Sequence, residues 1–106
     1  MANGDSRPVA LVTGSQRGIG RATAVALATA GFDIAANDLD YSEDLAGTVG
    51  AVEAAGGRAA PFTTDIADLR AHEGLLNRIS EHFGRLDCLV NNAGVSVLAR
   101  ADLLDV

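Results

Sequence analysis

Three glycines in one short stretch are spaced to bind a phosphate group. Gly14, Gly18 and Gly20 follow the apolar run of residues 9–12 and precede an alanine-rich segment. A buried strand, a glycine turn and a helix start place free backbone N–H groups at the positive end of the helix dipole, where anions bind. We expect Gly14 to allow the tight turn, Gly18 to let a pyrophosphate approach the backbone, and Gly20 to bring the helix close to the strand. The cofactor contacts predicted for this dinucleotide-binding turn are Gly14, Ser15, Gln16, Arg17, Gly18, Ile19 and Gly20.

An acidic residue stands where such a turn needs one. Asp38 ends the second apolar run, 18 residues after Gly20. In folds that bind a dinucleotide, the acid that binds the ribose lies about 20 residues after the glycine motif. A carboxylate there accepts both hydroxyls of the adenosine ribose and repels a 2′-phosphate, which predicts NAD rather than NADP; Leu39 beside it is predicted to contact the cofactor too. Arg17 favours the opposite choice, because a base in the glycine loop can reach a 2′-phosphate, but we give the spacing of Asp38 more weight. The alternative role for Asp38 is an acid near a helix start.

Two further polar segments follow the third and fourth predicted strands. Asp65 and Ile66 could hold the adenine edge, the carboxylate taking the exocyclic amine and the Ile66 backbone a ring nitrogen; the alternative is a turn ahead of a helix cap at Asp68. Of Asn91 and Asn92, we expect one to tie neighbouring strands, because a buried amide needs partners, and the other to face the cofactor. The predicted cofactor contacts in these segments are Asp65, Ile66, Asn92, Ala93 and Gly94.

The remaining reactive side chains indicate no catalytic or metal site. His72 and His82 have no acid or cysteine in a ligand arrangement, so we predict that both are solvated on a helix surface. Cys88 is predicted to pack in a strand, and Tyr41 to flank the adenine pocket or lie on the surface. We therefore assign no catalytic residue and no metal ligand.

Four predicted strands alternate with three predicted helices. The strands are expected at residues 9–13, 32–38, 58–63 and 86–91. The helices are expected at residues 18–30, at residues 42–55 after a cap at Asp40 or Ser42, and at residues 68–83. Short connections in this alternation predict an α/β fold with one parallel sheet, right-handed crossovers and helices on both faces. Pro61 cannot donate a ladder hydrogen bond and places the third strand at an edge, which gives the strand order 3-2-1-4.

Hydrophobic spacing predicts which face of each helix packs on the sheet. The first helix is expected to use Ile19, Thr23, Ala26, Leu27 and Ala30. The second is expected to use Leu45, Val49 and Val52, and the third Leu69, Leu76, Ile79 and Phe83. The fourth strand is left with an apolar edge, which a further strand usually covers.

Composition limits the classes of protein and partner. The chain has 106 residues, 48% of them hydrophobic, which predicts one globular domain over residues 1–106. Its net charge of −6 argues against a nucleic acid or an anionic membrane as partner, since both need clustered cations. One cysteine excludes an internal disulfide, and the N-terminal residues carry no secretory signal, so we expect a cytoplasmic protein.

Two motifs together resemble those of the short-chain dehydrogenases/reductases. Residues 13–20, Thr-Gly-Ser-Gln-Arg-Gly-Ile-Gly, match the Thr-Gly-x-x-x-Gly-x-Gly turn of that family, and residues 91–94 match its Asn-Asn-Ala-Gly motif. Asp65 stands where the family has its adenine-contacting acid, and the chain is similar to 3-oxoacyl-[acyl-carrier-protein] reductases among its members. The resemblance implies a Rossmann-type fold, a bound nicotinamide dinucleotide, and hydride transfer between that cofactor and a carbonyl or secondary alcohol. It also implies that the full-length enzyme is a homo-oligomer.

The sequence departs from this family in its catalytic residues. Family catalysis uses a Tyr-x-x-x-Lys pair with a Ser and a further Asn, whereas all eight basic residues here are Arg and the one tyrosine is Tyr41. We therefore interpret the chain as the N-terminal, cofactor-binding half of a longer single-domain enzyme, inactive by itself. One alternative is a non-catalytic nucleotide-binding or interaction module. Another is a methyltransferase that uses S-adenosylmethionine, which the Asn-Asn-Ala-Gly segment and the wide glycine spacing disfavour.

Overall fold

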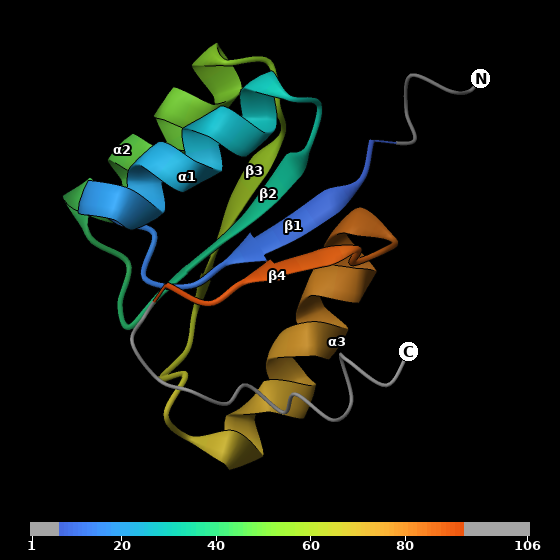
Figure 1. Ribbon diagram of the computed structural model, residues 1–106. Helices are drawn as coiled ribbons and strands as arrows, with labels where there is room; N and C mark the ends of the chain where they lie inside the picture. Colours follow the sequence, from blue (N-terminus) through green and yellow to red (C-terminus); the bar gives the residue numbers. More distant parts are fainter. Residues whose placement is uncertain (1–6, 93–106) are drawn as a thin grey trace.

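The computed structural model describes residues 7–92, and the predictions for Ala93 and Gly94 lie outside them. The strands are β1 (Val9–Val12), β2 (Asp33–Asp38), β3 (Ala59–Thr63) and β4 (Cys88–Val90). The α-helices are α1 (Gly18–Thr29), α2 (Glu43–Ala54) and α3 (His72–Phe83), and the short 3₁₀ helix η2 (Leu69–Ala71) leads into α3. Figure 1 shows α1 and α2 against one face of the sheet and α3 against the other.

The sheet is parallel throughout, with the strand order β3-β2-β1-β4. This order confirms the predicted α/β topology, including the edge position of the strand that contains Pro61. The inner strand β1 is buried along its whole length, as an uninterrupted apolar run predicts for a sheet covered on both faces. The carboxyl ends of all four strands therefore meet at one end of the sheet.

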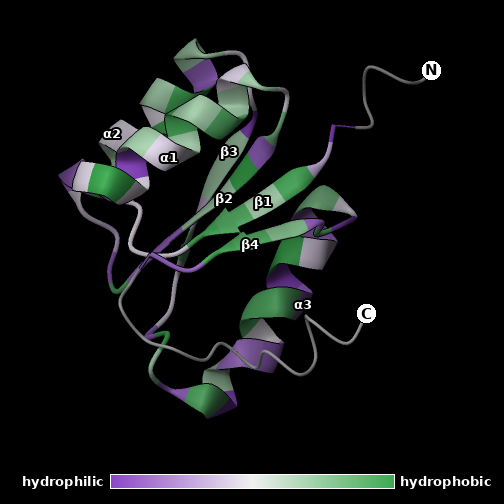
Figure 2. Cartoon of the chain, viewed as in Figure 1, coloured by the Kyte–Doolittle hydropathy of each residue, from purple (hydrophilic) through white to green (hydrophobic). Residues whose placement is uncertain are grey.

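Each face of the sheet has its own hydrophobic core. The core under α1 and α2 contains many alanines beside Ile34 and Leu45, whereas the core under α3 uses larger side chains such as Phe62 and Leu75. Figure 2 shows hydrophobic residues along the strands and hydrophilic residues where β2 and β4 end. No helix within residues 7–92 has the length and apolar character needed to cross a membrane.

The face of α1 that packs on the sheet differs from the predicted one. Its buried residues are Gly20, Ala24 and Ala28. The predicted residues Ile19, Ala26 and Ala30 are instead exposed. At Gly20 the helix comes so close to the glycine turn that even a Cβ atom would not fit, and this contact sets the rotation of the helix. The prediction was therefore wrong for these three residues, whereas the predicted Leu27 does pack, partly buried, against the core under α1 and α2.

The start of α3 corrects three further predictions, namely where the helix begins, that Leu69 packs on the sheet and that His72 is solvated. Asp68 caps η2, accepting the Arg70 N–H at 3.1 Å, and α3 itself begins at His72. A 3₁₀ turn rotates the chain differently from an α-helix, so Leu69 is 62% exposed while His72 turns into the core and is 1% exposed. The prediction that His72 is solvated is therefore wrong, whereas His82 is exposed as predicted.

The second helix is fixed by its N-cap and by a buried threonine. Ser42 caps α2, its Oγ accepting the Leu45 N–H at 3.2 Å. Thr48 is fully buried where Val49 was expected, and Val49 is only partly buried. A polar side chain is tolerated there because the Thr48 hydroxyl donates to the carbonyl oxygen of Ser15 at 2.7 Å. This bond ties α2 to the glycine turn.

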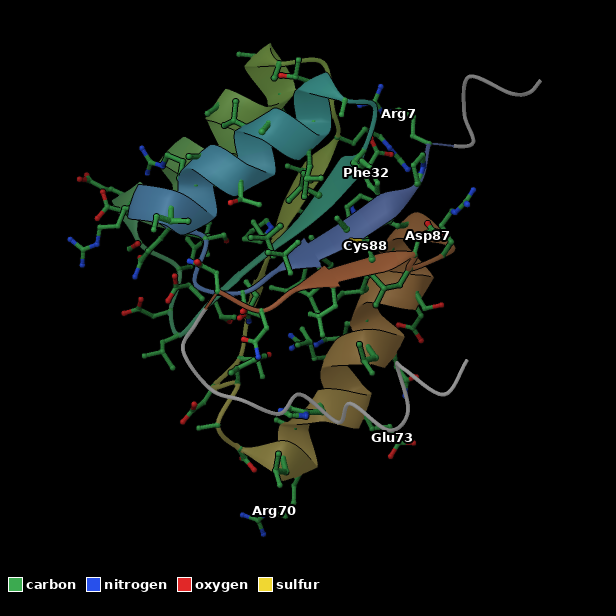
Figure 3. All side chains as sticks on the ribbon, in the orientation of Figure 1. Arg7, Phe32, Arg70, Glu73, Asp87 and Cys88 are labelled. Carbon is green, nitrogen blue, oxygen red and sulfur yellow. The ribbon has the colours of Figure 1, made fainter. Side chains whose placement is uncertain are left out.

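Ion pairs hold the amino end of the sheet. Asp33, 1% exposed, accepts from Arg7 Nε at 2.9 Å and from Arg58 Nε at 3.0 Å. Burial alone would raise the pKa of Asp33, but hydrogen bonds from the Arg58 backbone and guanidinium, and from Arg7, outweigh it and lower the pKa below its ordinary value. Asp87 accepts from the backbone of β1 at 2.8 Å and from Arg85, whose hydrogen bond lowers the pKa of Asp87. Figure 3 shows Arg7 and Asp87 at this end of the sheet.

Candidate functional site

A pocket of about 360 Å³ opens at the carboxyl end of the sheet. Segments that follow all four strands contribute to it. Its lining residues are Gly14, Asn37, Asp38, Leu39, Thr64, Asp65, Ile66, Ala67 and Asn92. Six of these nine are residues that the sequence predicts for the site, namely Gly14, Asp38, Leu39, Asp65, Ile66 and Asn92. The fold therefore brings together segments that lie up to 78 residues apart, as Gly14 and Asn92 do.

The three glycines of the turn meet different physical requirements. Gly14 and Gly18 have φ values of +61° and +64°, which favour glycine. A Cβ atom on Gly18 would meet nothing within 4 Å, so the space above this residue is open to a ligand. A Cβ atom on Gly20 would lie 2.0 Å from the Gly14 oxygen and 2.8 Å from Asn92 Nδ2. Gly20 is thus required for the close contact of α1 with the glycine turn, whereas Gly18 leaves room for a ligand at the protein surface.

The start of α1 is prepared for an anion. Its N-cap residue, Arg17, makes no side-chain capping bond, and the first turn contains no acid. The first N–H groups of a helix have no partner within the helix, and the dipole makes that end positive. The start of α2 differs, because Ser42 caps it and Glu43 and Asp44 lie in its first turn. Of these two helices, α1 is the one whose start keeps its N–H groups available for a negatively charged group.

The side chains of residues 15–17 point into the protein or the solvent and do not line the pocket. Ser15 is buried, and its Oγ donates to the Asn37 carbonyl oxygen at 3.1 Å. Gln16 Oε1 accepts from Ser42 Oγ at 2.6 Å. The Arg17 side chain is 76% exposed and lies 3.9 Å from Asp44. Any contact from these residues, or from the exposed Ile19, to a ligand in this pocket would have to come from the backbone or from a rearranged side chain.

Backbone groups fix the carboxylate of Asp38 in the pocket wall. Its Oδ2 accepts the Gln16 N–H at 3.2 Å, and its Oδ1 accepts the Leu39 N–H at 2.9 Å. The first of these bonds joins the end of β2 to the glycine turn. Each carboxylate oxygen has two lone pairs, so both can accept further hydrogen bonds. The geometry suits a ligand that presents paired hydroxyl donors.

Asp65 takes part in a turn and also lines the pocket. Its Oδ1 accepts the Ala67 N–H at 2.9 Å, and its carbonyl oxygen accepts the Asp68 N–H at 2.9 Å. Ile66, only 4% exposed, packs its side chain into the core below. The role as a turn residue ahead of the Asp68 cap and the position in the pocket are therefore compatible.

The asparagines after β4 support the glycine turn. The Asn92 N–H donates to Thr13 Oγ1 at 2.8 Å, and Asn92 Nδ2 donates to the Gly14 oxygen at 3.3 Å. Thr13 Oγ1 in turn donates to Asn91 Oδ1 at 3.1 Å. Asn91 thus bonds the end of the neighbouring strand β1, while Asn92 both supports the turn and lines the pocket.

Comparison with known proteins decides the family. Residues 8–105 match the short chain dehydrogenase family. The chain belongs to that family. It is 42% identical over 91 residues to a short-chain dehydrogenase/reductase of Armillaria gallica, covering 85% of this chain and 35% of that protein. It is 40% identical over 88 residues to a 3-oxoacyl-[acyl-carrier-protein] reductase of a Synechocystis strain, covering 83% of this chain and 36% of that protein.

Solved structures of the dehydrogenase family confirm the fold. The crystal structure of a 3-oxoacyl-[acyl-carrier protein] reductase from Brucella melitensis in complex with NAD matches with a TM-score of 0.78 at 44% identity, covering 86% of this chain and 35% of that one. Carveol dehydrogenase from Mycobacterium avium in complex with NAD matches with a TM-score of 0.75 at 37% identity, covering 83% and 36%. The chain thus spans about a third of the length of these relatives.

One residue that organises the site of this short chain dehydrogenase family member, Asn37, was not predicted from the sequence. Asn37, 1% exposed, donates through Nδ2 to the carbonyl oxygens of Phe62 and Thr64 at 2.8 and 3.4 Å. It therefore joins the end of β2 to the end of β3, and it lines the pocket with Thr64. The rule that a buried strand amide needs partners would have identified it. Within residues 7–92, no group of three His, Cys, Asp or Glu side chains could hold a metal ion.

Proposed function

We propose that this chain is the dinucleotide-binding part of an oxidoreductase that transfers hydride between NAD(H) and a carbonyl or secondary alcohol. The observation that supports this most is one pocket lined by a backbone-held carboxylate, Asp38, and by Gly14, which lies in the turn that leads into the uncapped start of α1. On this proposal, residues 1–106 are the dinucleotide-binding part of a longer enzyme that folds as a single domain. The NAD named in the titles of two similar structures supports the choice of cofactor.

The residues present fit a dinucleotide. In the proposed complex the N–H groups at the start of α1 hold the pyrophosphate, and the open space above Gly18 gives it room. Asp38 accepts the ribose hydroxyls, and Asp65 with the Ile66 backbone holds the adenine. Asn92, together with Ala93 and Gly94, faces the cofactor from the end of β4. The bound cofactor supplies the hydride donor or acceptor, and these residues bind and orient it.

The proposed preference for NAD over NADP rests on the charge of Asp38. This carboxylate lies in the pocket wall with two backbone N–H groups as its partners. A 2′-phosphate at the same place would bring two anions together, which is unfavourable. Arg17, the residue that could favour NADP, lies near Asp44, whose negative charge offsets it.

The test is a titration of the chain with NADH and with NADPH, followed by cofactor fluorescence. We expect NADH to bind at least about tenfold more tightly, which corresponds to about 1.4 kcal/mol. Asp38→Ala should narrow this ratio to about threefold or less, because the ribose acceptor and the repulsion are lost together. Asp40→Ala, which removes an exposed acid outside the pocket, is the matched control and should keep the ratio. Tighter binding of NADPH by the unmodified chain would show that Arg17 decides the preference.

Catalysis requires residues that these 106 do not contain. The Tyr-x-x-x-Lys pair used by the short-chain dehydrogenases/reductases needs a lysine, and these 106 residues include none. We therefore expect no carbonyl reduction by the chain alone, measured as NADH consumption with a 3-oxoacyl thioester. A 3-oxoacyl carbonyl is the substrate class that we propose for the whole enzyme, on the strength of the similarity to the Synechocystis reductase.

A further inference from the structure

We propose that His72 is a positioning residue for the adenine end of the cofactor, acting through the turn of residues 65–67. The inference rests on the proposed binding function. His72 is the first residue of α3 and is almost completely buried behind the pocket wall. It does not line the pocket itself. Its influence on a ligand must therefore pass through the residues that it holds.

The imidazole of His72 holds the carbonyl group of Ile66. Its Nε2 lies 2.7 Å from the Ile66 oxygen. A carbonyl oxygen can only accept a hydrogen bond, so Nε2 must carry the proton and donate. The bond is short and lies in the interior, where water competes little for either partner.

The same peptide group is held at its other end by Asp65. The Ala67 N–H donates to Asp65 Oδ1 at 2.9 Å. The Ile66 carbonyl and the Ala67 N–H belong to one planar peptide unit, so neither can rotate without the other. By fixing the carbonyl, His72 fixes the N–H, and the N–H fixes the carboxylate of Asp65. This carboxylate is the group that we propose for the adenine amine.

The second nitrogen of the ring shows that a histidine is costly at this position. His72 Nδ1 is buried and has no hydrogen-bond partner among the described residues. A buried polar atom without a partner is unfavourable, and an apolar side chain would avoid this cost. The neighbours one and two turns further along the same helix face, Leu75 and Ile79, are apolar and equally buried. The bond to Ile66 is the observed feature that distinguishes His72 from them.

The turn has other anchors, so loss of the His72 bond should loosen it without unfolding it. The Asp68 N–H donates to the Asp65 carbonyl oxygen at 2.9 Å, and the Ile66 side chain stays buried in the core. Without the His72 donor, the peptide unit between Ile66 and Ala67 is free to rotate between these anchors. Only part of the population then presents Asp65 correctly, and the apparent dissociation constant rises in inverse proportion to that fraction.

The first experiment compares His72→Leu with His72→Gln by NADH titration of the full chain, or of the longer gene product if the reading frame continues. Leucine removes the donor at similar volume, whereas a glutamine amide nitrogen can take the place of Nε2. We expect His72→Leu to raise the dissociation constant about tenfold and His72→Gln to stay within about twofold of the unmodified protein. Ile79→Val is the control for a slightly destabilised helix face and should leave binding unchanged.

The second experiment repeats His72→Leu in an Asp65→Ala background. If His72 acts through Asp65, its effect should shrink from about tenfold to about twofold or less, since coupled residues are not additive. An equal effect in both backgrounds, or equal binding by His72→Leu and the unmodified protein, would overturn the inference. Should the leucine variant not fold, His72→Asn, whose shorter amide cannot reach Ile66, takes its place in both experiments. Absence of NADH binding by the unmodified protein would contradict the proposed function itself.

Discussion

The two ends of the sheet hold their carboxylates in different ways. At the amino end, Asp33 is buried between the guanidinium groups of Arg7 and Arg58, and Asp87 pairs with Arg85. At the carboxyl end, the partners found for Asp38 and Asp65 within residues 7–92 are backbone N–H groups. Both kinds of partner order the side chain.

The difference decides what each carboxylate can still do. An arginine neutralises an acid and occupies its oxygens with directed donors. A backbone N–H orients the acid but leaves its negative charge and spare lone pairs in place. We therefore expect substitutions at the amino end to change stability and not binding. Substitutions at the carboxyl end should change binding, except where the residue also supports the fold.

Gly20→Ala should have the largest effect and is the expected exception. Its new Cβ atom would lie 2.0 Å from the Gly14 oxygen and 2.8 Å from Asn92 Nδ2, so α1 must move away from the turn. We expect a loss of about 3 kcal/mol or more in the free energy of unfolding, together with loss of NADH binding. Urea denaturation and NADH titration measure the two quantities.

Gly50→Ala is the matched control for that substitution. Gly50 lies in α2, and a Cβ atom there would meet nothing within 4 Å. Because alanine favours a helix over glycine, the control should be neutral or stabilising by up to about 1 kcal/mol. Equal behaviour of the two variants would contradict the close contact of α1 with the glycine turn.

Asp33→Asn should have the next largest effect, on stability alone. It removes a buried charge from between two arginines, and both guanidinium groups can still reach solvent because their side chains are 30% and 61% exposed. We therefore expect a loss of about 2 to 3 kcal/mol, less than for a fully buried pair. NADH affinity should stay within about twofold, and a tenfold loss would show that the two ends of the sheet are coupled.

The pH dependence of the Asp33→Asn effect has a definite sign. The pKa of Asp33 is lowered in the folded protein, so folding favours the ionised form. The stability that this contributes is fully present above the pKa of an unfolded carboxyl, about 3.9, and is lost as the pH falls through the lower folded value. The difference between the unmodified chain and the variant should be constant from about pH 7 to pH 5 and shrink below about pH 4.

The parts of the fold that could be predicted are those that local chemistry specifies. Pro61 specified an edge strand because it lacks a donor, and the alternation of strands and helices specified a parallel sheet. Likewise, the positive φ of Gly14 and Gly18 agrees with the requirement of a tight turn for glycine. These features depend on a residue and its near neighbours, which a single sequence contains.

The parts that could not be predicted depend on long-range contacts. The rotation of α1 is set by Gly20 against the turn and Asn92, so Ile19 faces outward although it is apolar. The inward turn of His72 depends on η2, which the hydrophobic spacing of an α-helix does not reveal. Asn37 belongs to the site through bonds to β3, a strand that follows much later in the chain.

Ser42→Ala should have the smallest effect and sharpens the comparison of the two ends of the sheet. Ser42 lies close to the glycine turn, bonded to Gln16 Oε1, but its Oγ also accepts the Leu45 N–H as the cap of α2. If capping is its main role, the variant should lose about 1 kcal/mol of stability and keep its NADH affinity within about twofold. Ser80→Ala, at an exposed position inside α3, is the control and should be neutral or slightly stabilising. A loss of affinity of tenfold or more would instead mean that Ser42 holds the glycine turn in place for the cofactor. A residue that stabilises the fold at the carboxyl end of the sheet would then contribute to cofactor binding as well.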